Sequence, residues 1–232
     1  MTSLVFAYGS QLWEGTVATV QLALLSLGLS FVIGLAGAAA KLSANRWYSM
    51  PATVYTTLIR GVPDLVLMLL LFYSFQDLLN RITDAFKQSQ IEIDPFLAGV
   101  CVLGLIYGAY FTETFRGAFL AVPRGQLEAA AAFGMTQGQT FRRILFPQMM
   151  RFALPGISNN WQVILKATAL VSIIGLRDVV RVAQDAITGT VSKGAYYAFL
   201  FLLTAALIYL LLAIVSDWVF HILMKHYSVG IR

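Results

Sequence analysis

The sequence has 232 residues, of which 59% are hydrophobic and only 12% are charged, and its mean hydropathy is +0.75. Soluble domains carry roughly 25% charged residues, so the composition excludes an ordinary soluble domain and indicates one all-helical, polytopic membrane domain over residues 1–232. The formal net charge of +5 suggests nucleic acid as a partner, but the distribution of the basic residues along the chain argues against that partner.

Five apolar segments approach the roughly 20 residues that a helix needs to cross a bilayer. They are residues 15–40, the residues after Arg60 up to about 79, and residues 95–112, 152–176 and 194–216. The first, third and fifth segments contain no charged residue, whereas the fourth contains Lys166 and several polar side chains. The sequence therefore predicts about five transmembrane helices, with the N-terminus outside and the C-terminus in the cytoplasm.

This orientation follows from the basic residues outside the spans, which favour the cytoplasmic side. The cytoplasmic segments then hold nine basic residues, namely Lys41, Arg46, Arg116, Arg124, Arg142, Arg143, Arg151, Lys225 and Arg232. The outer segments hold five, namely Arg81, Lys87, Arg177, Arg181 and Lys193. Membrane topology thus accounts for the positive charge, no nucleic-acid partner is expected, and loop 118–151 lies in the cytoplasm.

The beginning of the second span combines two charges with a helix break. Arg60 and Asp64 are four residues apart, so on one helix face they would pair. Gly61 and Pro63 between them predict a break that exposes a helix N-terminus, a place that holds anionic groups. Asp64 is therefore either the counter-ion of Arg60 or a carboxylate available to a cationic substrate. The depth of the break in the membrane stays open, because residues 51–79 are too long for one span.

Two further spans carry candidates for a substrate path, because ionisable groups inside a membrane are costly and indicate function. Glu113 and Arg116, three residues apart at the cytoplasmic end of the third span, form either a self-compensating pair or a gate or ligand contact. The fourth span is predicted to turn its polar side chains to a subunit interface or an aqueous path; the alternative is hydrogen bonding between helices. These side chains are Asn159, Asn160, Gln162, Lys166, Thr168 and Ser172.

Loop 118–151 has the pattern of two short helices. Pro123 suits the first turn of an alanine-rich helix, and Gly134 suits the residue just past its end. Thr136 and Gln139 form a capping-box pattern that begins a second helix, and Pro147 is expected to break or kink the chain before the fourth span. Such a compact pair fits a groove of a partner protein; the alternative is an amphipathic loop lying on the membrane surface. The charged side chains available for pairing across an interface are Glu128, Arg142 and Arg143.

Residues 176–194 alternate charged and apolar side chains in a way that predicts a short amphipathic helix on the outer surface. This helix is either a solvated connector or a gate that faces a binding protein. Histidine and cysteine, which often serve as catalytic groups or metal ligands, are rare: the sequence has two histidines, His221 and His226, and the lone Cys101. We therefore expect no catalytic site and no metal site.

The spacing E-A-A-x3-G-x9-I-x-x-P in loop 118–151 resembles the cytoplasmic coupling loop of membrane subunits of ATP-binding-cassette (ABC) importers. Residues 57–63, 107–117 and 165–172 resemble the R-G-x-P, A-Y-x-x-E-x-x-R-G and L-K-x-T-x-L-x-S elements of polar-amino-acid permeases. Within that family the chain most resembles the Q-type subunit of histidine/lysine/arginine/ornithine importers. The resemblance assigns coupling to an ATPase to Glu128, Ala129, Ala130, Gly134, Arg142, Ile144 and Pro147.

The resemblance implies a type I ABC importer-like fold in the bacterial inner membrane and import of basic amino acids; opines or other polar amino acids are the alternative. A periplasmic amino-acid-binding protein would deliver the substrate, and a homologous second permease subunit, in a hetero- or homodimer, would complete the path. The sequence contains no phosphate loop G-x-x-x-x-G-K-[ST], so ATP and Mg²⁺ are expected on a partner ATPase dimer. An ion-coupled secondary transporter is the alternative from another class, but it usually has more spans and internal repeats.

Overall fold

The computed structural model describes residues 7–86, 92–190 and 194–228, and all regular elements in these ranges are helices, with no strand among them. Its five long helices coincide with the five predicted spans. They are α2 (Gly9–Leu42), α4 (Asp64–Ala85), α5 (Pro95–Ala121), α8 (Phe146–Val171) and α10 (Ala195–Ser228). Lys87, Lys193 and Arg232, which enter the count of basic residues above, lie outside the described residues.

Four described helices are long and apolar enough to cross a membrane, namely α2, α4, α5 and Ala195–Lys225 of α10. The predicted fourth span, α8, has 26 residues, a sufficient length, but its polar side chains keep it out of this group. It packs instead against α5, α10 and α2, so its apolar face is covered by protein.

The centre of the bundle is α5, whose side chains Tyr107, Phe111 and Phe115 are among the largest that are fully buried. Its most extensive contact is with α2. A side chain at Gly34 of α2 would collide with Phe111, and one at Gly37 with Thr112. Small residues allow two membrane helices to approach closely, so α2 and α5 form a tightly packed scaffold.

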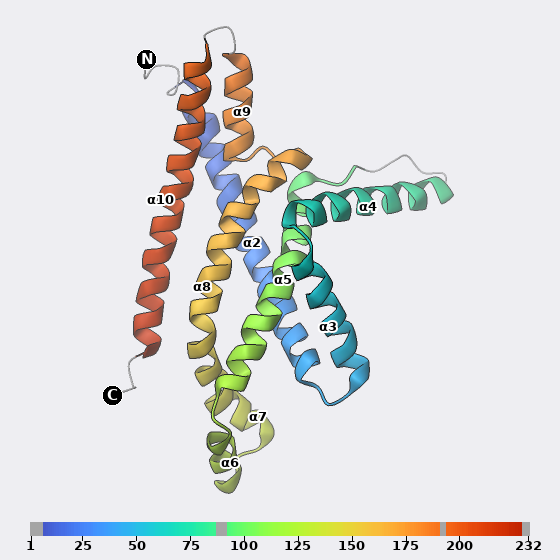
Figure 1. Cartoon of the computed structure of the whole chain (residues 1–232), viewed down its shortest axis with the longest axis vertical. Helices are drawn as coiled ribbons and strands as arrows, with labels where there is room; N and C mark the ends of the chain where they lie inside the picture. The colour runs from blue at the N-terminus through green and yellow to red at the C-terminus, as the bar shows by residue number, and fades with distance from the viewer. Residues whose placement is uncertain (1–6, 87–91, 191–193, 229–232) are drawn as a thin grey trace.

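The second predicted span lies differently from the others. Val62 and Pro63 adopt extended backbone between α3 (Arg46–Gly61) and α4, because proline has no amide to donate and disfavours helical backbone in the residue before it. α3 packs along α5, whereas Figure 1 shows that α4 extends sideways from the bundle. The break therefore redirects the chain within the height of the bundle.

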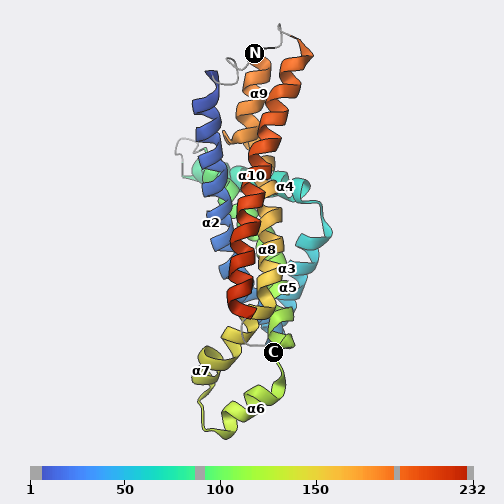
Figure 2. The same cartoon turned by 90° about the vertical axis from the view of Figure 1, so that its left-hand side faces the viewer.

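The two ends of the bundle carry short helices. At one end, α6 (Arg124–Ala132), α7 (Gln137–Thr140) and the π-helical turn η1 (Phe141–Leu145) project beyond the long helices (Figures 1 and 2). At the other end, the turn η2 (Ser172–Ile174) leads to α9 (Val179–Gly189), which packs against α2 and α10. The predicted amphipathic helix is thus confirmed, and its buried residues are Val179, Val182, Ala183 and Ala186.

Candidate functional site

The predicted coupling loop is a pair of short helices joined at Gly134, which has a φ of 76°, in the left-handed region. The amides of Gly134 and Met135 donate to the carbonyl oxygens of Ala131 and Ala130 at 2.9 and 3.1 Å. These two bonds satisfy carbonyl groups at the end of α6 in the way that a glycine-terminated helix does. The expected place of Gly134, just past the end of a helix, is confirmed.

The second helix of the pair begins at the predicted capping box. The Gln139 amide donates to Oγ1 of Thr136 at 3.3 Å, and the Thr136 amide donates to Oε1 of Gln139 at 3.0 Å. Of the break or kink expected at Pro147, the break is absent, because Pro147 lies in the first turn of α8 and the chain stays helical. Pro147 has no amide to donate, and the turn before it is π-helical, with the Phe146 amide donating to the Phe141 carbonyl.

Most of the surface of this helix pair is open. Among the predicted coupling residues, Ala130 is buried and Ile144 is half-buried. The exposed ones are Glu128, Ala129, Gly134, Arg142 and Pro147. Phe133 was not among the predicted coupling residues, although its side chain is 86% exposed at the end of α6; a large apolar residue beside the helix-ending glycine was the available signal.

Several charged side chains of the helix pair take part in no ion pair with the other described residues. None of the ion pairs of the described residues includes Glu128, Arg142 or Arg143. Exposed aromatic and arginine side chains are enriched where proteins bind each other, so this surface suits a protein partner.

Aromatic packing fastens the helix pair to the bundle. The ring of Phe141 lies 6.4 Å from that of Phe119 in α5 and 5.9 Å from that of Phe146 in α8, measured between centroids. Gln148 of α8 also donates a hydrogen bond to Oε1 of Gln126 in α6. A force on the helix pair therefore reaches both α5 and α8.

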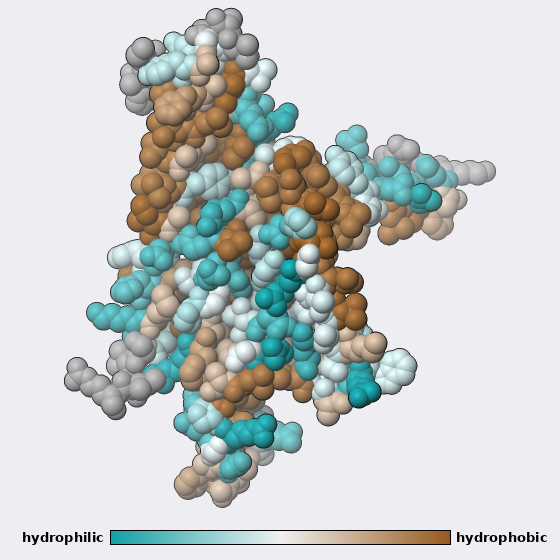
Figure 3. Space-filling model, viewed as in Figure 1, coloured by the Kyte–Doolittle hydropathy of each residue, from teal (hydrophilic) through white to brown (hydrophobic). Residues whose placement is uncertain are grey.

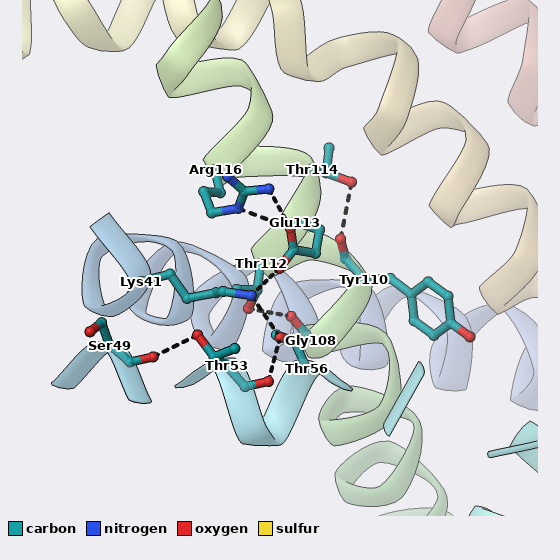
Figure 4. A network of polar contacts seen from close by, with 10 residues as sticks. All are labelled: Lys41, Ser49, Thr53, Thr56, Gly108, Tyr110, Thr112, Glu113, Thr114 and Arg116. Atoms are coloured by element: carbon teal, nitrogen blue, oxygen red, sulfur yellow. Dashed lines mark hydrogen bonds and ion pairs between the residues drawn. The ribbon is translucent and has the colours of Figure 1, made fainter. Parts of the chain in front are cut away.

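Glu113 is enclosed by two cations (Figure 4). Its Oε1 accepts from Nζ of Lys41 at 2.5 Å, and its Oε2 accepts from Arg116 at 2.9 Å. Lys41 also donates to Oγ1 of Thr56 at 2.9 Å, so α2, α3 and α5 meet at this carboxylate. The predicted pairing with Arg116 is present, but Lys41 was not foreseen because only the fold brings it near. Both oxygens of Glu113 are occupied, so it offers no free negative charge.

Arg60 and Asp64 do not form an ion pair, which was one of the two alternatives for Asp64. The four-residue spacing places side chains together only on a continuous helix, and the Val62–Pro63 break interrupts it. Instead, the guanidinium carbon of Arg60 lies 5.4 Å from the ring centroid of Tyr110, a cation–π geometry. Asp64 begins α4 and accepts from the Tyr107 hydroxyl at 2.7 Å. No ion pair of the described residues includes Asp64.

The polar side chains of the predicted fourth span do not all point in one direction, and two of them form the hydrogen bonds between helices that were the alternative. Asn160 donates to a hydroxyl of α5 at 3.1 Å, and Gln162 donates to a carbonyl of α10 at 3.1 Å. Thr168 and Ser172 are buried, whereas Asn159 and Lys166 are exposed. Consecutive helix positions point in different directions, so adjacent residues such as Asn159 and Asn160 separate. No hydrogen bond or ion pair is found for Lys166 among the described residues.

Five exposed positions of α8 form one stripe along the helix. They are Phe152, Pro155, Asn159, Val163 and Lys166, at the three- and four-residue spacing of a single helix face. This stripe lies between the side of α8 that bonds α5 and the side that bonds α10. Figure 3 shows hydrophilic residues gathered over the middle of α8 and α5. Polar side chains facing lipid are costly, so this face is suited to a protein or aqueous neighbour.

The chain is similar to known transport proteins over nearly its whole length. Residues 10–229 match the family described as "Binding-protein-dependent transport system inner membrane component". The chain is 56% identical over 229 residues to the histidine/lysine/arginine/ornithine transport system permease protein HisQ of Salmonella typhimurium, covering 99% of this chain and 98% of that one. It is 38% identical over 216 residues to the octopine transport system permease protein OccQ of Rhizobium radiobacter, covering 93% and 89%.

A solved structure has the same architecture. The crystal structure of an amino acid ABC transporter with histidines aligns over 96% of each chain with a TM-score of 0.77 and 28% sequence identity. The family match covers nearly the whole chain, and the helix pair at Gly134 agrees with it. The chain belongs to the family of binding-protein-dependent transport system inner membrane components.

Proposed function

We propose that the chain is the membrane-spanning permease subunit of an ATP-driven, binding-protein-dependent importer of basic amino acids in the bacterial inner membrane. The observation that carries the proposal is the helix pair at Gly134, which keeps the spacing of an importer coupling loop and presents it on an exposed surface. The names of the more similar relatives support histidine, lysine, arginine and ornithine as substrates; the opine permeases are more distant.

The partner at the helix pair is a dimer of ABC ATPase subunits, which would bind ATP and Mg²⁺. Phe133 supplies apolar contacts for it, and Glu128 and Arg142, which form no ion pair among the described residues, supply polar ones. Because Phe141 packs against both α5 and α8, displacement of the helix pair moves two helices of the bundle together. Residues 118–151 therefore act as the coupling loop of the single permease domain.

A homologous second permease subunit, identical to this chain or a sister of it, would cover the exposed stripe of α8. A lone chain would place Lys166 and Asn159 against lipid, which is costly. Facing a second subunit, the same side chains line an aqueous path between the two proteins. Lys166 is then available to an anionic group such as the α-carboxylate of an amino acid.

Asp64 is the carboxylate that suits a cationic substrate side chain. It lies beside the helix break, is half-buried, accepts a hydrogen bond from the Tyr107 hydroxyl, and forms no ion pair among the described residues. Glu113 has a different role, because Lys41 and Arg116 already neutralise it. Asn160 likewise is held inside the chain by its bond to α5, which makes it a structural contact rather than a substrate ligand.

The proposal is tested by purification of the tagged chain from its native membrane in mild detergent. An ABC ATPase should co-purify in stoichiometric amount with the wild-type chain and be lost with Gly134→Val. Purified preparations that import amino acids without any ATPase would overturn the proposal.

A further inference from the structure

The outer end of the bundle contains a buried carboxylate that the proposed function does not use. Asp178, at the start of α9, is 0% exposed. Its Oδ1 accepts from the Arg181 amide at 2.9 Å, and its Oδ2 accepts from the Tyr209 hydroxyl at 3.3 Å. Because Tyr209 belongs to α10, the carboxylate joins α9 to α10.

Neighbouring groups extend this contact to two more helices. The Tyr209 hydroxyl lies 3.3 Å from Oγ1 of Thr168 in α8. The amide of Val179 donates to Oγ1 of Thr19 in α2 at 3.5 Å. A Cβ at Gly15 of α2 would lie 3.0 Å from the Asp178 carbonyl oxygen, so the two backbones nearly touch. Four helices therefore meet at Asp178.

No cation neutralises this carboxylate in the described part of the chain. On α9 and just before it, Arg181 and Arg177 pair with Asp185 at 3.4 and 3.7 Å. The ionisable side chains at this end of α2 and α8 are Glu14 and Lys166, both exposed, and those of α10 are Tyr196, Tyr197 and Tyr209. Burial raises the pKa of Asp178 from 3.8 to about 6, against the lowering effect of its hydrogen bonds.

We infer that Asp178 is a positioning residue that holds α9 against α2, α8 and α10 at the outer end of the permease. The inference rests on the proposed function, in which the outer end receives amino acid from a binding protein. There, α9 would present a surface whose position is set by the contact between Asp178 and Tyr209.

The charge on Asp178 makes this contact sensitive to protons. Without a cation nearby, the ionised carboxylate is the less favourable form inside the protein. The stabilisation from protonation is fully present below the ordinary pKa of about 3.8 and is lost as the pH rises through about 6. Acidification should therefore hold α9 more tightly.

The experiment is hydrogen exchange on the intact complex in lipid nanodiscs, with peptides that cover α9 and with rates corrected for the chemical effect of pH. Protection of wild-type α9 should rise about tenfold from about pH 7.5 to about pH 5, because the pKa of Asp178 is higher when α9 is held against the bundle than when α9 is open. In Asp178→Asn, which retains a helix-capping side chain without titrating, this rise should vanish. Tyr209→Phe should lower protection about fivefold at both pH values, through loss of one hydrogen bond.

Two matched variants serve as controls. Glu14→Gln removes an exposed acid from α2 at the same end of the bundle, and Tyr196→Phe removes an exposed hydroxyl from α10; both should keep the wild-type response. A pH response that survives in Asp178→Asn, or unchanged protection in Tyr209→Phe, would overturn the inference. Because exchange is read without transport, a chain that shows the response but imports nothing would contradict the proposed function alone.

Discussion

The coupling helix pair is held by contacts between residues close in the sequence, whereas the charged middle of the bundle is held by contacts between residues far apart in it. In the helix pair, bonds join near neighbours such as Thr136 and Gln139. In the middle, Lys41 meets Glu113, and Asp64 meets a tyrosine of α5. Because the contacts within the helix pair are local, its exposed side chains remain available to a partner. In the middle of the bundle, long-range contacts engage Lys41, Glu113 and Asp64. Substitutions in the first region should therefore affect partner binding, and those in the second should affect folding or substrate choice.

The largest effect is expected at Gly134. Valine strongly disfavours the left-handed backbone that Gly134 adopts, at a cost of about 1–2 kcal/mol or more, although no other atom crowds the position. Gly134→Val should abolish uptake in whole cells while the chain still inserts in the membrane at normal levels. Gly134→Asn, which tolerates this backbone, should retain most uptake, and the helical control Gly138→Ala should be unaffected. Normal uptake by Gly134→Val would show that this turn does not matter for coupling.

Glu113 should contribute more to stability than Lys41, the partner that was not predicted from the sequence. Glu113→Gln leaves Lys41 and Arg116 without a counter-ion, and we expect a loss of about 3 kcal/mol in the free energy of unfolding. Lys41→Met leaves Glu113 paired with Arg116 and should cost about 1 kcal/mol. Unfolding of the purified chain in mixed micelles measures both. Equal losses would mean that the carboxylate is not the centre of the cluster.

Phe133 should anchor the ATPase. Phe133→Ala is expected to weaken binding of the purified ATPase to the permease in nanodiscs by about 2 kcal/mol, or roughly 30-fold. Phe133→Leu should keep most of the affinity, because an apolar side chain still fills the contact. Phe86→Ala removes an equally large exposed ring at the end of α4 and should change nothing. Unaltered binding by Phe133→Ala would remove this residue from the interface.

The smallest and most selective effect is expected at Asp64. Asp64→Asn should reduce uptake of arginine about tenfold, the value of one charge-assisted hydrogen bond, and leave uptake of a neutral amino acid nearly unchanged. Competition between labelled arginine and labelled glutamine in proteoliposomes measures the difference. An equal loss for both substrates, or no loss for either, would take Asp64 out of the substrate path.

The sequence predicted those features that depend on neighbouring residues. The five long helices, the left-handed Gly134 and the capping box of Thr136 all follow from apolar length or short spacing. Of the two roles left open for Asp64, the ion pair with Arg60 is absent, because the spacing rule assumes a helix that Pro63 interrupts. Lys41 is 72 residues from Glu113, and nothing in one sequence announces such a contact. The sideways course of α4 and the division of Asn159 from Asn160 also depend on packing.

The central claim, that this permease is driven by ATP through the helix pair, is tested most directly by uptake of labelled arginine into proteoliposomes that contain the whole complex. With the binding protein outside, uptake should require ATP inside, persist when ion gradients are collapsed, and disappear with Gly134→Val. Uptake that proceeds without ATP and follows a proton or sodium gradient would contradict the account.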